Sequence, residues 1–318
     1  MGPKEAYHPS VVRPSVPLTT LRFEDVPNYA RRKFVLTGYR PIMRPNESIV
    51  ATSLWALFSV HNETMNVWSH LLGAIWFACC YFELRSHNLA PAMSQPSTDL
   101  EKTEATALVV ERLRTIAPVF SAAAVICLSM SSIAHLMAPV SPRRLSRTLW
   151  TLDSLGISMC ILSGYFPAMT FGFRCLPAER DLYTAVVVLL SLASAVMGLA
   201  AASGTVPYFE RVRVLVLVLL VLFGLWPLFR YRLTAPPAEI AAFVPLNCLM
   251  FVMNGLGLTC YATKWPESRW PGAFDLRGGS HLLWHLATLS GLLCYQSSLM
   301  RMIHWFDDER QGMCDGWA

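Results

Sequence analysis

Long runs of apolar residues without charged side chains limit most strongly how this chain can fold. Seven such runs, each near the length that crosses a bilayer, lie at about residues 64–82, 116–138, 149–171, 182–203, 212–229, 240–263 and 280–302. About 20 apolar residues span a bilayer core. The composition agrees, because 54% of the residues are hydrophobic and only 15% are charged, against about 25% charged in soluble domains. We therefore predict an all-α polytopic membrane protein with a bundle of seven transmembrane helices, and we exclude a water-soluble enzyme.

The apolar runs divide the chain into four parts. These are a cytosolic basic arm (1–46), an interfacial helix at the membrane surface (47–63), the seven-helix domain (64–305) and a short extracellular or lumenal acidic tail (306–318). Residues 47–60 could instead begin a longer first span. We expect short loops, except at residues 83–115. The fifth span is the least regular, because Arg211 and Arg213 begin it and Pro227 lies near its end.

The distribution of Lys and Arg predicts how the bundle is oriented. With seven spans, the arm and the even-numbered loops share one side and carry 16 Lys and Arg residues, whereas the other side carries 10. Because basic loops stay in the cytosol, we predict a cytosolic N-terminus, in the plasma membrane or in the endomembranes (Golgi or endoplasmic reticulum). This orientation, and the lack of DRY-like and NPxxY-like motifs, argue against a G-protein-coupled receptor. No nucleic-acid partner is expected.

The cysteines do not form a paired metal-binding pattern. Seven of the nine lie within the apolar runs, where cysteine behaves as a small hydrophobic residue. A disulfide between the remaining two, Cys175 and Cys314, is possible, but nothing in the sequence requires it.

Three histidines are placed where they could bind one metal ion. His281 and His285 begin the seventh span at positions i and i+4, so they project from one helix face about 6 Å apart. His135 ends the second span, which runs in the opposite direction and therefore finishes on the same cytosolic side. Three protein ligands with one open position are typical of catalytic zinc. The alternative is that these are hydrogen-bonded packing residues, the role we assign to His70.

Two further polar residues lie at the same depth. Ser131 precedes His135 by four residues, one turn deeper on the same face. Asp153 is the only acid within the predicted spans, about one turn into the third. An acid inside the membrane is costly and usually functional. We therefore predict that Asp153 and Ser131 act beside a zinc ion held by His135, His281 and His285, with Asp153 accepting the proton of a zinc-bound water.

The motifs around these residues resemble those of the progestin and adiponectin receptor (PAQR) family, which is related to haemolysin III-like proteins and alkaline ceramidases. They are GYRP at 38–41, HNETMNVWSH at 61–70, SSIAH at 131–135, LDSLGI at 152–157, PE at 266–267, PGAFD at 271–275 and GSHLLWH at 279–285. Each motif alone is weak, but their shared order is specific. Ser154 and Leu282 depart from the family pattern, which often has Tyr and Gln there.

The resemblance implies a receptor with a cytosolic N-terminus, zinc on the three histidines, and in some members weak hydrolysis of ceramide. Three hypotheses compete. The first is a zinc-dependent lipid amide hydrolase coupled to signalling, with ceramide or its fatty acid in the bundle. The second is a steroid (progestin) or adiponectin-like receptor with purely structural zinc and no hydrolase activity. The third is a scaffold that binds a cytosolic partner through residues 1–60, in which deleting the arm would leave the bundle folded.

Overall fold

The computed structural model describes residues 20–44, 47–87, 100–203 and 208–308, together with Cys314 and Trp317. Their helices are α1 (Ile49–Leu57), α2 (Thr64–His87), α3 (Leu100–Met137), α4 (Arg143–Gly172), α5 (Pro177–Ser203), α6 (Tyr208–Phe223), α7 (Leu225–Thr234), α8 (Pro237–Thr263) and α9 (Ser280–Asp308). Short 3-10 helices lie at Phe23–Asp25, Asn28–Ala30 and Ala138–Val140. The predicted all-α class is confirmed.

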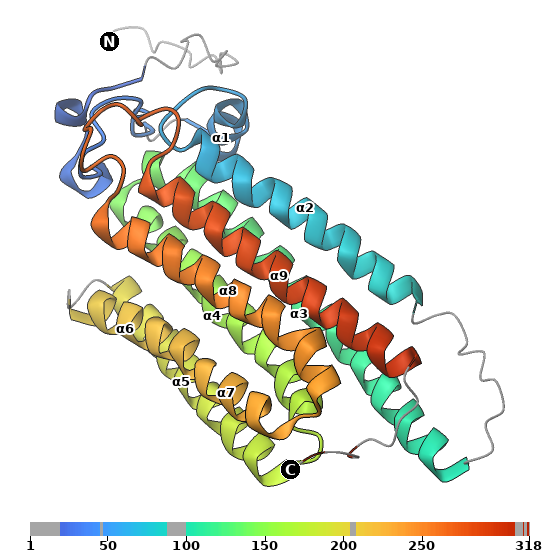
Figure 1. Cartoon of the computed structure of the whole chain (residues 1–318). Coiled ribbons are helices and arrows are strands. Elements are labelled where there is room, and N and C mark those ends of the chain that lie inside the picture. The colour runs from blue at the N-terminus through green and yellow to red at the C-terminus, as the bar shows by residue number, and fades with distance from the viewer. Residues whose placement is uncertain are drawn as a thin grey trace, which may run out of the picture.

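The long helices lie side by side in one bundle, with α9 packed against α8, α2 and α3 (Figure 1). Each of α3, α4 and α5 also packs against the helix that follows it. Phe77 of α2, Phe120 and Leu128 of α3 and Leu299 of α9 are buried between them. The start of α2, the end of α3 and the start of α9 all lie at the end of the bundle that α1 covers. We call this the α1 end.

Within the part of the chain that the structure describes, six segments are long and apolar enough to cross a membrane, and α9 completes the heptahelical bundle. The fifth of them, Val214–Thr234, comprises both α6 and α7. These helices are separated at Gly224, three residues before Pro227, which has no N–H to donate to the carbonyl of Phe223 and whose ring clashes with that carbonyl. At the same place the Tyr165 hydroxyl donates a hydrogen bond of 2.8 Å to the carbonyl of Leu220. That carbonyl would otherwise accept from the N–H of Gly224, which instead donates to Val221 at 3.1 Å. The irregularity predicted for this span is therefore a break between two helices.

α9 is not among the six because its polar residues lower its hydropathy. Ser280, His285, Gln296 and Ser298 of α9 are all buried. Polar groups on a transmembrane helix usually face the interior of the bundle, and α9 has neighbours on several sides. Its sequence therefore resembles a lipid-facing span less than the others do.

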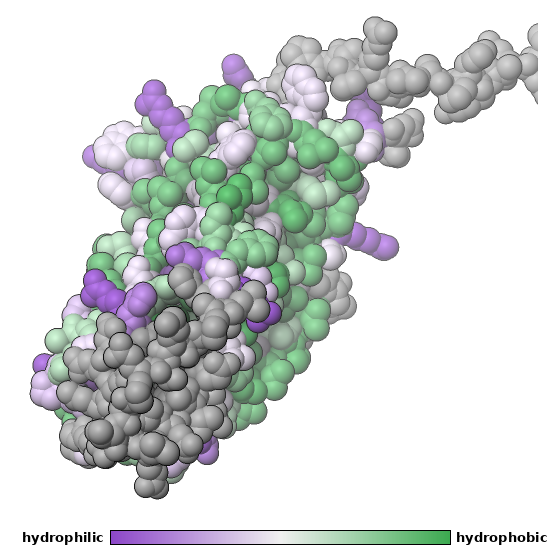
Figure 2. Space-filling view, turned by 90° about the vertical axis from the view of Figure 1, so that its right-hand side faces the viewer, coloured by the Kyte–Doolittle hydropathy of each residue, from purple (hydrophilic) through white to green (hydrophobic). Residues whose placement is uncertain are grey.

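The outer face of the bundle is apolar. Leu182, Leu189 and Leu199 of α5 are 60–66% exposed, and apolar residues cover much of the flank in Figure 2. In a soluble protein, apolar patches of this extent are rare. The surface therefore suits contact with lipid tails, as expected of a membrane-embedded bundle.

The expected long loop at residues 83–115 is wrong over most of its length, because α2 continues to His87 and α3 begins at Leu100. The stretch 100–114 is rich in Leu, Glu, Ala and Arg, which favour helix. Cys175 and Cys314 form a disulfide, with their Cα atoms 5.6 Å apart, at the end of the bundle opposite α1. Residues 1–19 of the predicted arm and most of the predicted tail lie outside the described residues.

Candidate metal centre

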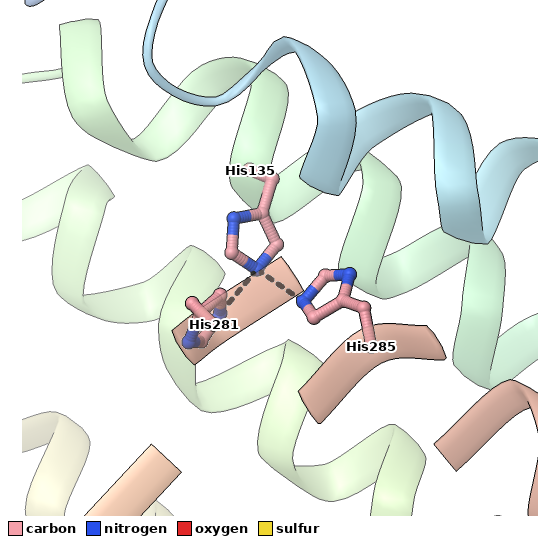
Figure 3. Close-up of side chains that lie close together, drawn as sticks. All are labelled: His135, His281 and His285. Carbon is pink, nitrogen blue, oxygen red and sulfur yellow. Dashed lines mark hydrogen bonds between the residues drawn. The ribbon is translucent and has the colours of Figure 1, made fainter. Parts of the chain in front are cut away.

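Three imidazoles converge at the α1 end of the bundle. His135 lies in the last turn of α3, while His281 and His285 lie in the first two turns of α9 (Figure 3). Nε2 of His135 is 3.2 Å from Nε2 of His281 and 3.2 Å from Nε2 of His285. The possible ligand atoms of all three lie within 4.8 Å of one another. The helices therefore bring together the three residues that we expected to share an ion.

Hydrogen bonds to the Nδ1 atoms of His135 and His285 indicate which tautomers these two histidines adopt. Nδ1 of His135 lies 2.8 Å from a carboxylate oxygen of Glu63, so Nδ1 carries the proton. Nδ1 of His285 lies 3.2 Å from the hydroxyl of Ser69, which already donates its own proton to the carbonyl of Asn66 at 2.9 Å. The Ser69 oxygen must therefore accept from His285. When each ring carries a single proton, its Nε2 is consequently left with a lone pair.

Two lone pairs facing each other at 3.2 Å cannot form a hydrogen bond, and a cation between them resolves the conflict. Zn–N bonds of 2.0–2.1 Å at a tetrahedral angle place two ligand nitrogens about 3.3 Å apart, close to the distance observed here. Imidazole nitrogen suits Zn, Cu, Fe and Ni. The residues therefore fit a transition-metal ion bound through three Nε2 atoms, although the geometry alone does not select among these elements.

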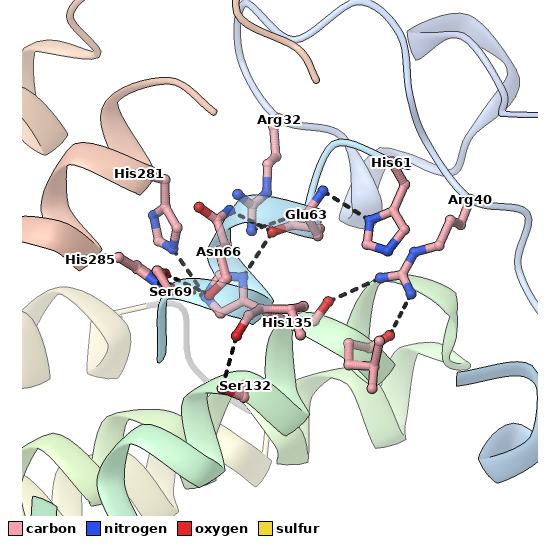
Figure 4. Close-up of polar contacts among 12 residues, drawn as sticks. Arg32, Arg40, His61, Glu63, Asn66, Ser69, Ser132, His135, His281 and His285 are labelled. Atoms are coloured by element: carbon pink, nitrogen blue, oxygen red, sulfur yellow. Dashed lines mark hydrogen bonds and ion pairs between the residues drawn. The ribbon is translucent and has the colours of Figure 1, made fainter. Parts of the chain in front are cut away.

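Glu63 holds His135 in this orientation. Its carboxylate accepts hydrogen bonds from His135, from the amide of Asn66 at 2.7 Å and from the guanidinium of Arg32 at 2.6 Å (Figure 4). Burial alone would raise the pKa of Glu63, but Arg32 and His135 hold that pKa well below its ordinary value. Such a carboxylate–histidine pair fixes the ring and makes it a better metal ligand.

Arg40 fixes the backbone of the same histidine. Its guanidinium is buried and donates to the carbonyls of Leu136 at 2.7 Å and His135 at 3.0 Å (Figure 4). These are among the last carbonyls of α3, which have no partner within the helix. The segment 20–44 is therefore packed against the bundle: Arg40 binds the backbone of His135, and Arg32 binds Glu63, the partner of its ring.

Ser131 and Asp153 lie on α3 and α4, two helices that pack against each other. Ser131 is buried one turn before His135. On α4, the edge of Trp150 packs on the His135 ring with centroids 4.8 Å apart, and Asp153 follows one turn later on the same side of the helix. Among the described residues, the possible metal ligands that lie within 4.8 Å of one another are the three histidines, and Asp153 is not part of that group. The catalytic roles of Ser131 and Asp153 stay predictions.

Several contributors at the start of α2 are not among the site residues predicted from the sequence. Glu63, Asn66 and His70 follow the spacing i, i+3, i+7, which places them on one helix face at the α1 end. That spacing was the available signal. His70, interpreted as a packing residue, stacks on His285 with ring centroids 3.7 Å apart and an interplanar angle of 15°. Neither of its ring nitrogens has a hydrogen-bond partner within the described part of the chain.

Comparison with known proteins gives consistent matches along most of the chain. The sequence model of a family described as "Haemolysin-III related" matches residues 58–296, which include all three histidines. "Heptahelical transmembrane protein 1" of Arabidopsis thaliana is 25% identical over 289 residues, covering 89% of this chain and 81% of the relative. "Progestin and adipoQ receptor-like protein 1" of Caenorhabditis elegans is 26% identical, and the "Adiponectin receptor protein" of Drosophila melanogaster is 27% identical. The matches cover 89% and 88% of this chain, but only 60% and 59% of these two animal relatives.

Proposed function

Because the chain belongs to the haemolysin-III-related family, among the progestin and adipoQ receptor proteins, we propose that it is a membrane receptor whose three histidines hold a zinc ion and that it hydrolyses a lipid amide such as ceramide. The observation that carries this proposal is the pair of Nε2 lone pairs that face each other at 3.2 Å. The imidazole of His281 supplies a third nitrogen, and three protein ligands with an open fourth position are typical of catalytic zinc.

When bound, zinc supplies Lewis-acid polarisation of a carbonyl and activation of a water molecule. Asp153 is the proposed general base, because it follows Trp150 by one turn and Trp150 packs on His135. Its carboxylate takes the proton of the attacking water and delivers it to the amide nitrogen as the C–N bond breaks. The hydroxyl of Ser131 orients the carbonyl oxygen. The products are a fatty acid and an amine, and the apolar bundle holds the acyl chain.

The proposal includes a cytosolic α1 end. Two independent features support this orientation. Lys and Arg are more numerous on the side that carries the arm. The disulfide between Cys175 and Cys314 lies at the opposite end, and disulfides persist in extracellular or lumenal compartments rather than in the cytosol.

The test is metal analysis and lipid-amide hydrolysis by the purified protein in detergent. The wild type should contain one zinc per chain and release fatty acid from ceramide, and a chelator should abolish the release. His285→Ala should lose both zinc and activity. His304→Ala is the matched control, because His304 is an exposed histidine of the same helix α9 at its other end. Equal turnover by His285→Ala and the wild type would refute the proposal.

A second candidate is a receptor in which the ion is purely structural. It is favoured by the way Glu63 and Ser69 link α2 to the imidazoles of α3 and α9, so that one ion fastens three helices. In that case His285→Ala would lower the unfolding temperature, and zinc-loaded wild type would hydrolyse no lipid amide tested. The relatives named as adiponectin and progestin receptors suggest the corresponding ligand classes.

A further inference from the structure

A cavity of about 320 Å³ lies beside the metal centre at the α1 end. One wall is formed by the segment around Tyr29 to Tyr39, and another by the α8–α9 connection with Lys264 and Asp275. His281 also lines the cavity, so it reaches the candidate ligands. Small-molecule sites occupy about 300–1,000 Å³. The space therefore suits a small polar group rather than a whole lipid.

Each carboxylate that lines this cavity accepts hydrogen bonds from other groups, while Oδ1 of Asp275 has no hydrogen-bond partner among the described residues. Glu63 is held by its three partners near His135. Glu267 accepts from the backbone N–H of Ser280 at 2.6 Å and from the Ser280 hydroxyl. One oxygen of Asp275 accepts from two backbone N–H groups, of which that of Thr37 lies at 2.7 Å, and from the Thr37 hydroxyl at 2.8 Å. Each acid therefore fixes a piece of local structure.

The cations that line the cavity are engaged less completely. Within the described residues, neither Lys33 nor Lys264 forms an ion pair with a carboxylate. The ammonium of Lys264 rests over the ring of Tyr261, 3.7 Å from its centroid, and burial lowers the pKa of this lysine. Arg32 gives one nitrogen to Glu63 and keeps 27% of its side chain exposed. These groups form a cationic lining next to a centre that would itself hold a divalent cation.

We propose that this cavity binds a phosphate group, with Lys264 and Arg32 as its charged contacts. Because the two cations come from different walls, they can contact a tetrahedral anion from two sides. A guanidinium also offers several N–H donors to phosphate oxygens, and an ammonium supplies a point charge. The phosphate could belong to a soluble anion or to the head group of a lipid in the adjoining leaflet.

The experiment measures thermal unfolding of the full-length, metal-loaded protein in detergent. Three probes are titrated at constant ionic strength: inorganic phosphate, dioctanoyl phosphatidic acid and, as an uncharged control, dioctanoylglycerol. Phosphate should raise the unfolding temperature saturably, because a ligand that binds only the folded state stabilises it. Lys264→Gln should weaken phosphate binding about 10- to 100-fold, as expected for a lost charge-assisted hydrogen bond. Arg269→Gln, an exposed cation of the same connection outside the lining, should bind like the wild type.

Stabilisation by phosphatidic acid at lower concentrations than by inorganic phosphate would assign the site to a lipid head group, and the reverse order would assign it to a soluble anion. Either result supports the proposal if Lys264→Gln weakens it. Phosphate bound to the metal ion alone would be insensitive to Lys264→Gln, so equal affinities of Lys264→Gln and the wild type would overturn the proposal. An absence of stabilisation by both phosphate probes would overturn it as well. Because the readout does not involve turnover, this result is separable from that of the hydrolase test.

Discussion

Replacing Glu63 by Gln tests whether this buried carboxylate prepares His135 to bind metal. The two side chains have nearly the same shape, but the carboxylate accepts on both oxygens: Arg32 on one, and His135 with Asn66 on the other. The amide of Gln accepts on only one oxygen. Whichever way it turns, its NH2 group faces a donor. One charge-assisted hydrogen bond is therefore lost, at about 1.5–3 kcal/mol.

We expect this loss to weaken zinc binding about 10- to 100-fold, the range found when an outer partner of a metal-bound histidine is removed. That range corresponds to about 1.4–2.8 kcal/mol, in agreement with the hydrogen-bond estimate. The assay is competition for zinc between the purified protein and a fluorescent chelator. Glu47→Gln, which changes an exposed acid of the same end, should keep the wild-type affinity. A folded Glu63→Gln protein that binds zinc within about twofold of the wild type would refute the proposed role of Glu63.

Three other predictions concern stability. Burial lowers the pKa of His61 to about 4 from 6.5, so the folded state favours the neutral ring, and about 3 kcal/mol of stability should be lost as the pH falls from 6.5 to 4. Subtracting the unfolding profile of His61→Gln from that of the wild type checks this, and parallel profiles would contradict it. Arg40→Met should destabilise the protein by about 2–4 kcal/mol and release metal, because two carbonyls at the end of α3 lose their donor. Arg40→Lys should rescue only part of this loss in denaturant unfolding, and full rescue would disprove the role of the guanidinium fork. Cys314→Ser should lower stability by about 2–4 kcal/mol, because the disulfide to Cys175 joins residues 139 apart. The metal content of Cys314→Ser should stay unchanged, and a loss of zinc in that variant would contradict the separation of the two ends.

The helical class and the meeting of the three histidines at one end could be predicted from the sequence, because each of these features depends on local patterns. Apolar runs set the helices, and alternating directions place the end of α3 beside the start of α9. Pro227 marked this span as irregular, but the contact between the Tyr165 hydroxyl of α4 and the Leu220 carbonyl at the break was not predictable from a local pattern. The helical turns before residue 115 were not predicted, because an apolar run shows which residues lie inside the bilayer and not where the helix begins or ends.

The partners of the histidines were harder to predict because they come from distant parts of the chain. Glu63 meets His135 across 72 positions, and Arg40 meets its carbonyl across 95. In the sequence, Arg40 belongs to a basic cluster. Such a cluster is typical of a solvent-exposed arm that sets the orientation of a membrane protein. Only the folded chain reveals that this arginine is buried. The spacing of Glu63, Asn66 and His70 did contain usable information, but it required knowing which face of α2 points inward.

The burial of Arg40 has a consequence for truncation experiments on the N-terminal arm. A deletion that begins at the N-terminus and passes residue 32 removes the guanidinium that neutralises Glu63, and one that passes residue 40 also uncovers the end of α3. A functional defect of such a deletion would then reflect disturbed surroundings of the three histidines as readily as a missing binding partner. Shortening the chain only within residues 1–19, or replacing single side chains, would keep the two explanations apart.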